Sequence, residues 1–558
     1  MKLLLYAARQ AKAAVIWATL LGVVGGAVTA WTVALLGDLL SKGVTSSSQL
    51  WQFIALAMAA PILRYISAEV LSRFSQRHLL DMSHELSARV VRSKLRSVEE
   101  LGSDRLLATL TDDLSVITGM LAAMPMLIAN VAVLVGCLIY VAYLSWVVFG
   151  LVALAMILGI ALYMWVVKRA NAWMQQARNE RDALLGHYHA LTDGFTELKL
   201  HRPRRETFLR DTLRSSLSTI LRLNVSGLAL YNFAANYNQW LFFVVVGFIV
   251  FGSPSWLGSD LSVKTSAVLA LLYLRAPLEI AVNWFPNVAR AEIALKKYQD
   301  VLTRLPVEHD AEDGGRPVPR FDQLDLVNVT YAYEGSEREQ FGIGPINMTV
   351  RAGEIVFMTG GNGSGKTTLA KILAGLYVPA TGELRVNGEA ITPENRDHYR
   401  QLLSCVFAKF HLFRELLGVS RPTLDADAGE WLRRMRLQDR VKVNAGTFST
   451  LDLSTGQRKR LALLVSMLED RPICIFDEWA SDQDPQYREE FYSHLLPELK
   501  ARRKAVIVIS HDDRYYTKGD RLIKLDEGQI VIDRDMRQPD TYQPGASAVG
   551  AGVELARG

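Results

Sequence analysis

Long apolar runs separated by charged stretches fill the first 300 residues. A helix needs about 20 mostly apolar residues to cross a bilayer. The run at 114–167 holds 54 residues without Asp, Glu, Lys, Arg or His, which is enough for two helices with a break near Ser145. The pattern therefore predicts six membrane-spanning helices. They are residues 13–37, residues 50–72, two within 114–167, one within 223–259, and residues 265–288.

The charges between these runs orient them. Most Lys and Arg residues precede the first run, follow the sixth, or lie in the two long polar stretches 73–113 and 168–222. The loops on the other side are short and carry few charges. Because basic residues favour the cytoplasmic side, both termini are expected in the cytoplasm. The two polar stretches are rich in helix formers, and we expect them to extend the spans into the cytosol.

Some polar side chains fall inside the predicted spans. Arg275 and Glu279 are one turn apart in the sixth span. They can form an internal ion pair that holds the helix, or they can line a solute cavity, because membrane-buried charges usually face a bundle interior or water. The cavity interpretation gains support from polar residues in other spans. These candidate cavity residues are Arg64, Asn232 and Asn236.

Composition agrees with a membrane protein of several domains. The chain has 558 residues, of which 50% are hydrophobic, and a net charge of only +5. This charge is typical of basic flanks around membrane spans, and it argues against a nucleic-acid partner. The cysteines Cys137, Cys405 and Cys474 lie too far apart in the sequence for a metal site or a disulfide framework.

The hydrophobic pattern changes after the sixth span. Residues 1–302 form the predicted transmembrane domain, and residues 303–320, rich in Pro, Gly and charge, the predicted linker. Residues 321–536 read as a mixed, water-soluble domain. Residues 537–558 are low in complexity and are expected to be disordered.

A glycine-rich segment carries the strongest chemical signal. It follows an apolar strand at 354–359, precedes a helix-forming stretch, and matches G-x-x-x-x-G-K-[ST]. Such a loop wraps backbone N–H groups around phosphates, and the helix N-terminus adds positive charge. Lys366 is expected to reach the β- and γ-phosphates of ATP, and Thr367 to hold Mg²⁺. The predicted loop residues are Gly360, Gly361, Asn362, Gly363, Ser364, Gly365, Lys366, Thr367 and Thr368.

Two further apolar strands end in chemically useful residues. Residues 472–476 precede Asp477 and Glu478, and residues 505–510 precede His511. Asp477 suits the Mg²⁺ shell, and Glu478 can polarise the water that attacks the γ-phosphate. His511 is expected to contact the γ-phosphate.

The order of motifs GGNGSGKTT, LSTGQ, ICIFDE, SDQD and ISH resembles the ABC transporter family. Six spans before one nucleotide domain look like a half-size exporter. More narrowly, LSTGQRKRLALL, FDEWASDQDP and ISHDDRYY are similar to the branch that exports cyclic peptides and siderophores, of the pyoverdine and syringomycin types, in Gram-negative bacteria. The implied fold is an α-helical six-span transmembrane domain of the ABC exporter type, followed by an α/β P-loop nucleotide-binding domain.

The resemblance implies a homodimer with two ATP molecules between the nucleotide domains. Ser454 and Gly456 of one copy would cap the γ-phosphate held by Lys366 of the other. Tyr333 would stack on adenine, with Tyr331 as the alternative. Asp484 matches a dimer-contact segment. Residues 98–101 and 201–205 look like the helices that touch the nucleotide domains.

Two positions depart from the family pattern. The usual Gln near the Mg²⁺ shell is replaced by Ala408, followed by Lys409, and neither can make the same contact. Thr455 replaces a Gly of the signature, which is a milder change. The first change leaves open whether ATP turnover is slow or tightly coupled to cargo.

The expected function is ATP-driven export of a peptide-like metabolite from cytosol to periplasm through the bacterial inner membrane. Periplasmic or outer-membrane accessory proteins are left open as partners. A flippase for lipids or lipid-linked sugars is the first alternative. A third interpretation is an ATP-gated channel or regulator with little hydrolysis. The missing Gln at Ala408 favours it, and the intact Glu478 and His511 oppose it.

Overall fold

The computed structural model describes residues 12–42, 46–251, 261–308, 320–333 and 342–537. Most of the predicted linker, and the predicted tail beyond residue 537, lie outside the described residues. The chain divides into two compact units. The first comprises Met1–Ser87 and Asp104–Val301, and the second Ala88–Ser103 and Leu302–Gly558.

Within the described residues, the first unit holds six helices that are long and apolar enough to cross a membrane, which confirms the predicted number. Ser145 separates the third from the fourth in an extended conformation, and its Oγ accepts a hydrogen bond from the Val148 N–H at 3.4 Å. The six helices are α2 (Lys12–Lys42), α3 (Ser47–Arg92), α6 (Leu114–Leu144), α7 (Trp146–Asp193), α10 (Arg214–Phe251) and α12 (Leu261–Arg304).

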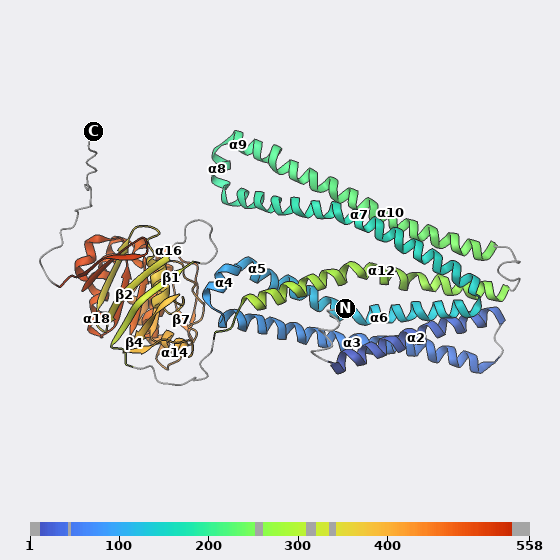
Figure 1. Ribbon diagram of the computed structural model, residues 1–558, viewed down its shortest axis with the longest axis horizontal. Helices are drawn as coiled ribbons and strands as arrows, with labels where there is room; N and C mark the ends of the chain where they lie inside the picture. Colours follow the sequence, from blue (N-terminus) through green and yellow to red (C-terminus); the bar gives the residue numbers. More distant parts are fainter. Residues whose placement is uncertain (1–11, 43–45, 252–260, 309–319, 334–341, 538–558) are drawn as a thin grey trace. The chain divides into compact units, whose positions relative to one another are not determined.

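Shorter helices and π-helical turns occupy the polar stretches between the spans. Helices α7 and α10 run side by side as a long hairpin closed by α8 and α9 (Figure 1). The elements are α4 (Leu95–Leu101), α5 (Ser103–Ala108), η1 (Thr109–Asp113), α8 (Phe195–Leu200), α9 (Arg202–Thr207) and η2 (Phe208–Leu213).

Small residues let α2 and α6 approach closely. A Cβ on Gly26 would lie 2.5 Å from the Ala129 carbonyl oxygen, and one on Gly136 would lie 2.5 Å from Ala30 Cβ. Close backbone contact of this kind is a main source of helix association in membranes, where lipid is as apolar as the side chains. A buried hydrogen bond from Ser67 Oγ to the Ala18 carbonyl, 2.6 Å long, ties α3 to α2.

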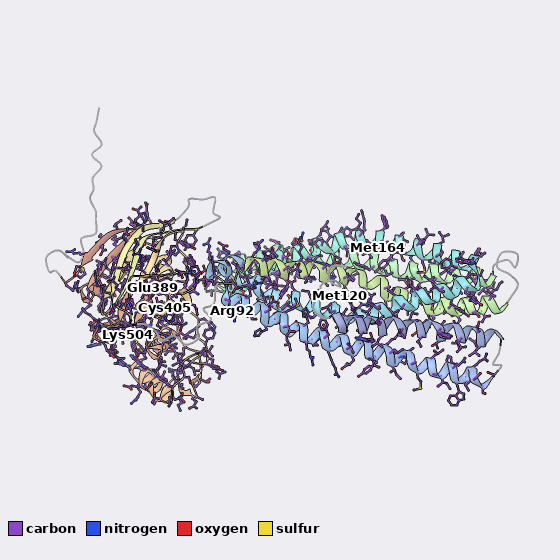
Figure 2. All side chains as sticks on the ribbon, turned by 60° about the horizontal axis from the view of Figure 1, so that its bottom comes forward. Arg92, Met120, Met164, Glu389, Cys405 and Lys504 are labelled. Atoms are coloured by element: carbon purple, nitrogen blue, oxygen red, sulfur yellow. The ribbon has the colours of Figure 1, made fainter. Side chains whose placement is uncertain are left out.

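Many large apolar side chains of the first unit point outward, as expected for helices that face lipid. Met164 on α7 is 50% exposed, whereas Met120 on α6 is buried; both are labelled in Figure 2.

The described residues of the second unit form two main sheets and a small two-stranded one. A six-stranded sheet has the order β12-β11-β3-β10-β9-β6, parallel except for the antiparallel edge strand β12. A four-stranded antiparallel sheet has the order β2-β1-β4-β5. The strands are β1 (Gln323–Ala332), β2 (Gly342–Arg351), β3 (Ile355–Gly360), β4 (Thr381–Val386), β5 (Glu389–Ala390), β6 (Leu403–Val406), β9 (Ile473–Asp477), β10 (Ala505–Ile509), β11 (Arg521–Asp526) and β12 (Gln529–Asp535).

Successive side chains along β3 point to opposite faces of the sheet and enter two separate hydrophobic cores. Ile355 and Phe357 of β3 belong to one cluster, and Val356 and Met358 to the other. Strands β9 and β10 are buried at every position, as expected for parallel strands covered on both faces. The remaining elements surround this sheet. They are α13 (Lys366–Leu373), α14 (Arg396–Arg400), α15 (Leu424–Arg434), β7 (Val443–Asn444), β8 (Thr447–Phe448), α16 (Thr455–Glu469), η3 (Trp479–Asp482), α17 (Pro485–Glu490), η4 (Phe491–Leu495), α18 (Leu496–Ala501) and η5 (Asp513–Lys518).

Candidate functional site

Glycine fixes the turn between β3 and α13. Gly360 has φ +150°, and a Cβ there would lie 2.2 Å from the Leu525 carbonyl oxygen. Gly365 has φ +100° and begins α13. A side chain would clash at Gly360 and would strain the backbone at Gly365. With glycine at both positions, no side chain covers the backbone N–H groups there. Gly361, Asn362 and Gly363 are exposed at the tip.

Lys366 folds back over this loop. Its Nζ donates hydrogen bonds to the carbonyls of Gly360, at 2.9 Å, and Gly361, at 2.8 Å. Burial lowers the pKa of Lys366, and the nearby carboxylates of Glu478 and Asp477 act in the opposite direction. The ammonium group is therefore held at the loop, where it can exchange these carbonyls for phosphate oxygens.

Thr367 and Asp477 meet across the loop. Thr367 Oγ1 donates to Asp477 Oδ2 at 3.1 Å, and Asp477 is 1% exposed at the end of β9. Burial raises the pKa of Asp477, while the hydrogen bond from Thr367 lowers it. Among the described residues, the other oxygen, Oδ1, and the buried Ser364 Oγ have no hydrogen-bond partner. A hydroxyl and an unpartnered carboxylate oxygen fit Mg²⁺, which prefers hard oxygen ligands alongside substrate phosphates.

Glu478 and His511 follow adjacent parallel strands and come together. His511 Nε2 lies 3.4 Å from Glu478 Oε1. The backbone N–H of Glu478 donates to the Ile509 carbonyl of β10, and its carbonyl accepts from Lys459 Nζ at 2.7 Å. This arrangement fixes a carboxylate and an imidazole beside the loop, which suits activation of a water for attack on phosphorus.

The signature segment begins α16. Ser454 caps this helix in a capping box, in which its Oγ accepts from the Gln457 N–H. A Cβ on Gly456 would lie 2.7 Å from the Asp482 carbonyl oxygen, and the Gly456 carbonyl accepts from Gln483. Ser454 is exposed, so the N-terminus of a 15-residue helix faces outward. Within the described part of the chain, no contact joins Ser454 or Gly456 to Lys366.

Asp484 caps a different helix. Its Oδ1 accepts a hydrogen bond from the Tyr487 N–H at 3.1 Å, at the start of α17. The side chain is exposed. The structure thus gives Asp484 a local capping contact.

The two aromatic candidates for adenine differ in their surroundings. Tyr331 is 8% exposed and stacks on Tyr377 at 4.9 Å between ring centroids, so it belongs to the core. Tyr333 is partly buried, and its hydroxyl shares a 2.8 Å hydrogen bond with Thr368 Oγ1 of α13. Its position next to the loop favours Tyr333 over Tyr331 for contact with the base.

Ala408 reaches the Mg²⁺ side of the site through its backbone. The backbone of Ala408 lowers the pKa of the Asp477 carboxyl, against the larger effect of burial. The side chains of Ala408 and Lys409 are exposed. The chain therefore supports Asp477 here without the amide side chain that the family pattern supplies.

A cavity of about 440 Å³ lies between α7, α10 and α12 in the first unit. Four of the five polar residues singled out in the spans line it: Asn232, Asn236, Arg275 and Glu279. Arg64 is not among its lining residues. It packs instead against α2, where a Cβ on Gly25 would lie 3.2 Å from Arg64 Cγ. Tyr163, Tyr231 and Gln239 complete the polar part of the wall.

Sequence reasoning missed residues that act across long sequence distances. Lys459 bonds to the Glu478 carbonyl and also lies 2.6 Å from Asp482 Oδ2, which joins α16 to the catalytic segment. The sequence shows only that a Lys stands two residues after LSTGQ. Its partner is a backbone carbonyl, which no residue type reveals.

Comparison with known proteins agrees with this geometry. Residues 343–481 match the sequence profile described as ABC transporter. The chain is 34% identical over 527 residues to the ATP-binding protein SyrD of Pseudomonas syringae pv. syringae, covering 92% of this chain and 93% of that protein. It is 25% identical over 550 residues to the ATP-dependent lipid A-core flippase of Burkholderia thailandensis, covering 92% and 90%.

A solved structure shares the fold. A bacterial Atm1-family ABC exporter with ATP bound aligns with a TM-score of 0.71 at 16% identity, covering 95% of this chain and 96% of that one. Together with the matched nucleotide domain and the 34% identity to SyrD over 92% of the chain, this fold shows that the chain belongs to the ABC transporter family, with the architecture of a half-size exporter and ATP hydrolysis coupled to transport.

Proposed function

We propose that two copies of this chain export a peptide-like secondary metabolite, such as a cyclic peptide or a siderophore precursor, from cytosol to periplasm. In this proposal the protein resides in the bacterial inner membrane with both termini in the cytosol. The observation that carries it is the chemistry of the cavity between α7, α10 and α12.

The cavity wall combines apolar and hydrogen-bonding groups. Amide side chains of Asn232, Asn236 and Gln239 can both donate and accept, as a cargo with peptide bonds requires. Apolar residues such as Met156 and Phe242 offer contact area to the cargo's hydrophobic side chains. Asn236 Nδ2 already donates to the Asn232 carbonyl at 2.8 Å. A lipid acyl chain would offer no partner to the remaining amide donors and acceptors, which is costly away from water.

The same cavity wall carries two charged side chains. Arg275 and Glu279 are both exposed to the cavity side, and no ion pair joins them among the described residues. The internal ion-pair interpretation therefore loses its support. Charges at this depth are costly unless they meet water or a charged partner. A cargo that carries a carboxylate or an amine would supply one.

ATP hydrolysis follows from the residues at the loop. Lys366 and the loop N–H groups would hold the phosphates, and Thr367 and Asp477 would hold Mg²⁺, which neutralises phosphate charge when bound. Glu478 would orient and deprotonate the attacking water, with His511 beside it. The exposed N-terminus of α16, with Ser454 and Gly456, would complete the site of a second copy.

Stimulation of ATP turnover tests the cargo. Full-length protein in lipid nanodiscs is titrated with an amphipathic cyclic peptide and, separately, with a lipid A-type glycolipid. We expect the peptide to raise turnover several-fold, and Arg275→Ala to weaken this response at unchanged basal turnover. Arg178→Ala, an exposed cation of α7 outside the cavity lining, is the matched control.

A flippase is the second candidate, because relatives described as lipid A-core flippases align with most of the chain at about a quarter identity. Stimulation by the glycolipid and not by the peptide would favour it. Absence of multiple turnover under both conditions would instead favour an ATP-gated channel or regulator.

A further inference from the structure

Helix α4, from the first polar stretch, belongs to the second unit and packs on the nucleotide domain. Backbone contacts just before α4 hold it to the start of the nucleotide domain. Ser93 forms a β-bridge with Val307, and the Glu308 N–H donates to the Arg92 carbonyl at 2.8 Å. The helix thus has a defined place beside the nucleotide site.

Arg96 of α4 contacts the ring of Tyr333. Its guanidinium carbon lies 4.7 Å from the ring centroid, which is within the range of a cation–π interaction. The guanidinium is itself oriented by a hydrogen bond from Nε to Glu100 Oε1 at 2.5 Å. Tyr333 is therefore held from its face by Arg96 and at its hydroxyl by Thr368.

Glu99 provides a second anchor to α13, the helix that follows the phosphate loop. Its carboxylate accepts from Lys371 Nζ at 2.7 Å and from the Tyr377 hydroxyl at 2.5 Å. Burial and the hydrogen bond to Glu99 raise the pKa of Tyr377, so the phenol keeps its proton as donor. Because Tyr377 also stacks on Tyr331, the aromatic group and α4 form one packed cluster.

We propose that Arg96 is a positioning residue for the adenine site, and that adenine binding in turn strengthens the docking of α4. The inference rests on the adenine contact proposed for Tyr333. A ring already oriented by Arg96 and Thr368 loses less freedom when a base stacks on it. Thermodynamic linkage makes this effect reciprocal. If docking of α4 raises the affinity for adenine by some factor, adenine binding raises the equilibrium constant for docking of α4 by the same factor.

The test uses full-length protein in nanodiscs. Arg96→Ala is compared with Arg96→Lys and with Lys94→Ala, which removes an exposed cation two residues away that makes no side-chain capping bond. We expect Arg96→Ala to raise the KM for ATP about fivefold, equivalent to about 1 kcal/mol at 1.4 kcal/mol per tenfold. Arg96→Lys, which keeps a cation, should lie between, and Lys94→Ala should match the wild type.

Hydrogen exchange of the wild-type protein gives an independent readout. ATP should slow amide exchange in Leu95–Leu101, whereas tripolyphosphate, which lacks the base, should not. An unchanged KM in Arg96→Ala, or exchange in α4 that is insensitive to ATP or responds equally to tripolyphosphate, overturns the inference.

Tyr333→Ala distinguishes a wrong adenine contact from a wrong role for Arg96. If it leaves the KM for ATP unchanged, the adenine contact itself is wrong and the inference falls with it. If Tyr333→Ala raises the KM and Arg96→Ala does not, only the role of Arg96 is wrong. Size-exclusion profiles and melting temperatures identify variants that fail to fold, and the wild-type exchange experiment remains decisive in that case.

Discussion

At the scale of single residues, Asp477 and Glu478 show how one strand end serves two purposes. Asp477 is buried and faces Thr367, whereas Glu478 takes a left-handed conformation with φ +51° and turns toward His511. Backbone strain of this kind costs about 1–3 kcal/mol and persists only where surrounding contacts hold it. Here the bonds of the Glu478 backbone to Ile509 and Lys459 do so.

The buried charge of Asp477 makes a prediction for Asp477→Asn. Burial raises the pKa of this carboxyl, so the folded state binds a proton more readily than the unfolded state. Above the folded pKa the ionised form therefore lowers stability, and this cost disappears as the pH falls through that pKa. Without nucleotide, Asp477→Asn should melt at or above the wild-type temperature at neutral pH, with the difference shrinking toward acidic pH.

The same substitution should lower ATP turnover by at least about 100-fold, because a proposed Mg²⁺ ligand is lost. Thermal melts at several pH values and a phosphate-release assay measure both effects. Asp439→Asn, at an exposed site far from the loop in sequence, is the control. A variant that melts well below the wild type at neutral pH, or that keeps its turnover, would contradict this account of Asp477.

Ala408 makes a second residue-scale prediction. Its backbone supports Asp477, and its exposed side chain leaves space for a longer group. Ala408→Gln should therefore supply an amide near the attacking water and raise kcat a few-fold, with little change in the KM for ATP. Steady-state kinetics against Lys409→Gln, which places the same amide one residue away, measures this. Equal or lower kcat in Ala408→Gln would show that the missing amide does not limit turnover.

At the scale of elements, close packing of α2 on α6 depends on glycine. No side chain fits at Gly26, where a Cβ would also lie 2.6 Å from Ala132 Cβ. Gly26→Leu should force the helices apart and lower the melting temperature, with a free-energy cost of about 1–3 kcal/mol or more. Gly150→Leu on α7, where a Cβ meets nothing within 4 Å, should leave it unchanged. Equal melting of both variants in detergent would contradict the close α2–α6 contact.

The elements that the sequence predicts are those with a strong local pattern. Six charge-poor runs, the break at Ser145, and the buried strands β3, β9 and β10 all follow from hydropathy and length. The order of the strands in the six-stranded sheet does not, because pairing of β6 beside β9 joins residues about 70 positions apart. The packing of α4 on the nucleotide domain also depends on distant contacts, which no periodicity encodes.

The candidate site divides in the same way. Lys366 and Thr367 follow one apolar strand through the glycine-rich loop, and Asp477 and Glu478 stand at the end of another. These motifs predict a shared site, and the structure brings the residues together. Arg64 shows the limit of such reasoning. Arg64 and Arg275 both fall inside predicted spans, but the rotation of each helix decides which residue meets the cavity. That rotation is set by packing against neighbouring helices.

At the scale of the whole molecule, the site is proposed to need a second copy. Ser454 is exposed at the N-terminus of α16 and has no contact with Lys366 in the described chain. Ser454→Arg should block closure around the γ-phosphate and lower turnover at least about tenfold, while equilibrium binding of ATP to the loop persists. Binding of a fluorescent ATP analogue and phosphate release measure the two separately. Turnover that survives this substitution would contradict a site shared between copies.

The most direct measurement is cargo uptake into inside-out proteoliposomes, with wild-type protein and Glu478→Gln side by side. The account predicts ATP-dependent accumulation of an amphipathic cyclic peptide by the wild type, none by Glu478→Gln despite retained ATP binding, and normal uptake by Glu430→Gln, an exposed carboxylate of α15. Peptide uptake that continues in Glu478→Gln, or a wild type that turns over ATP and moves glycolipid but no peptide, would contradict it.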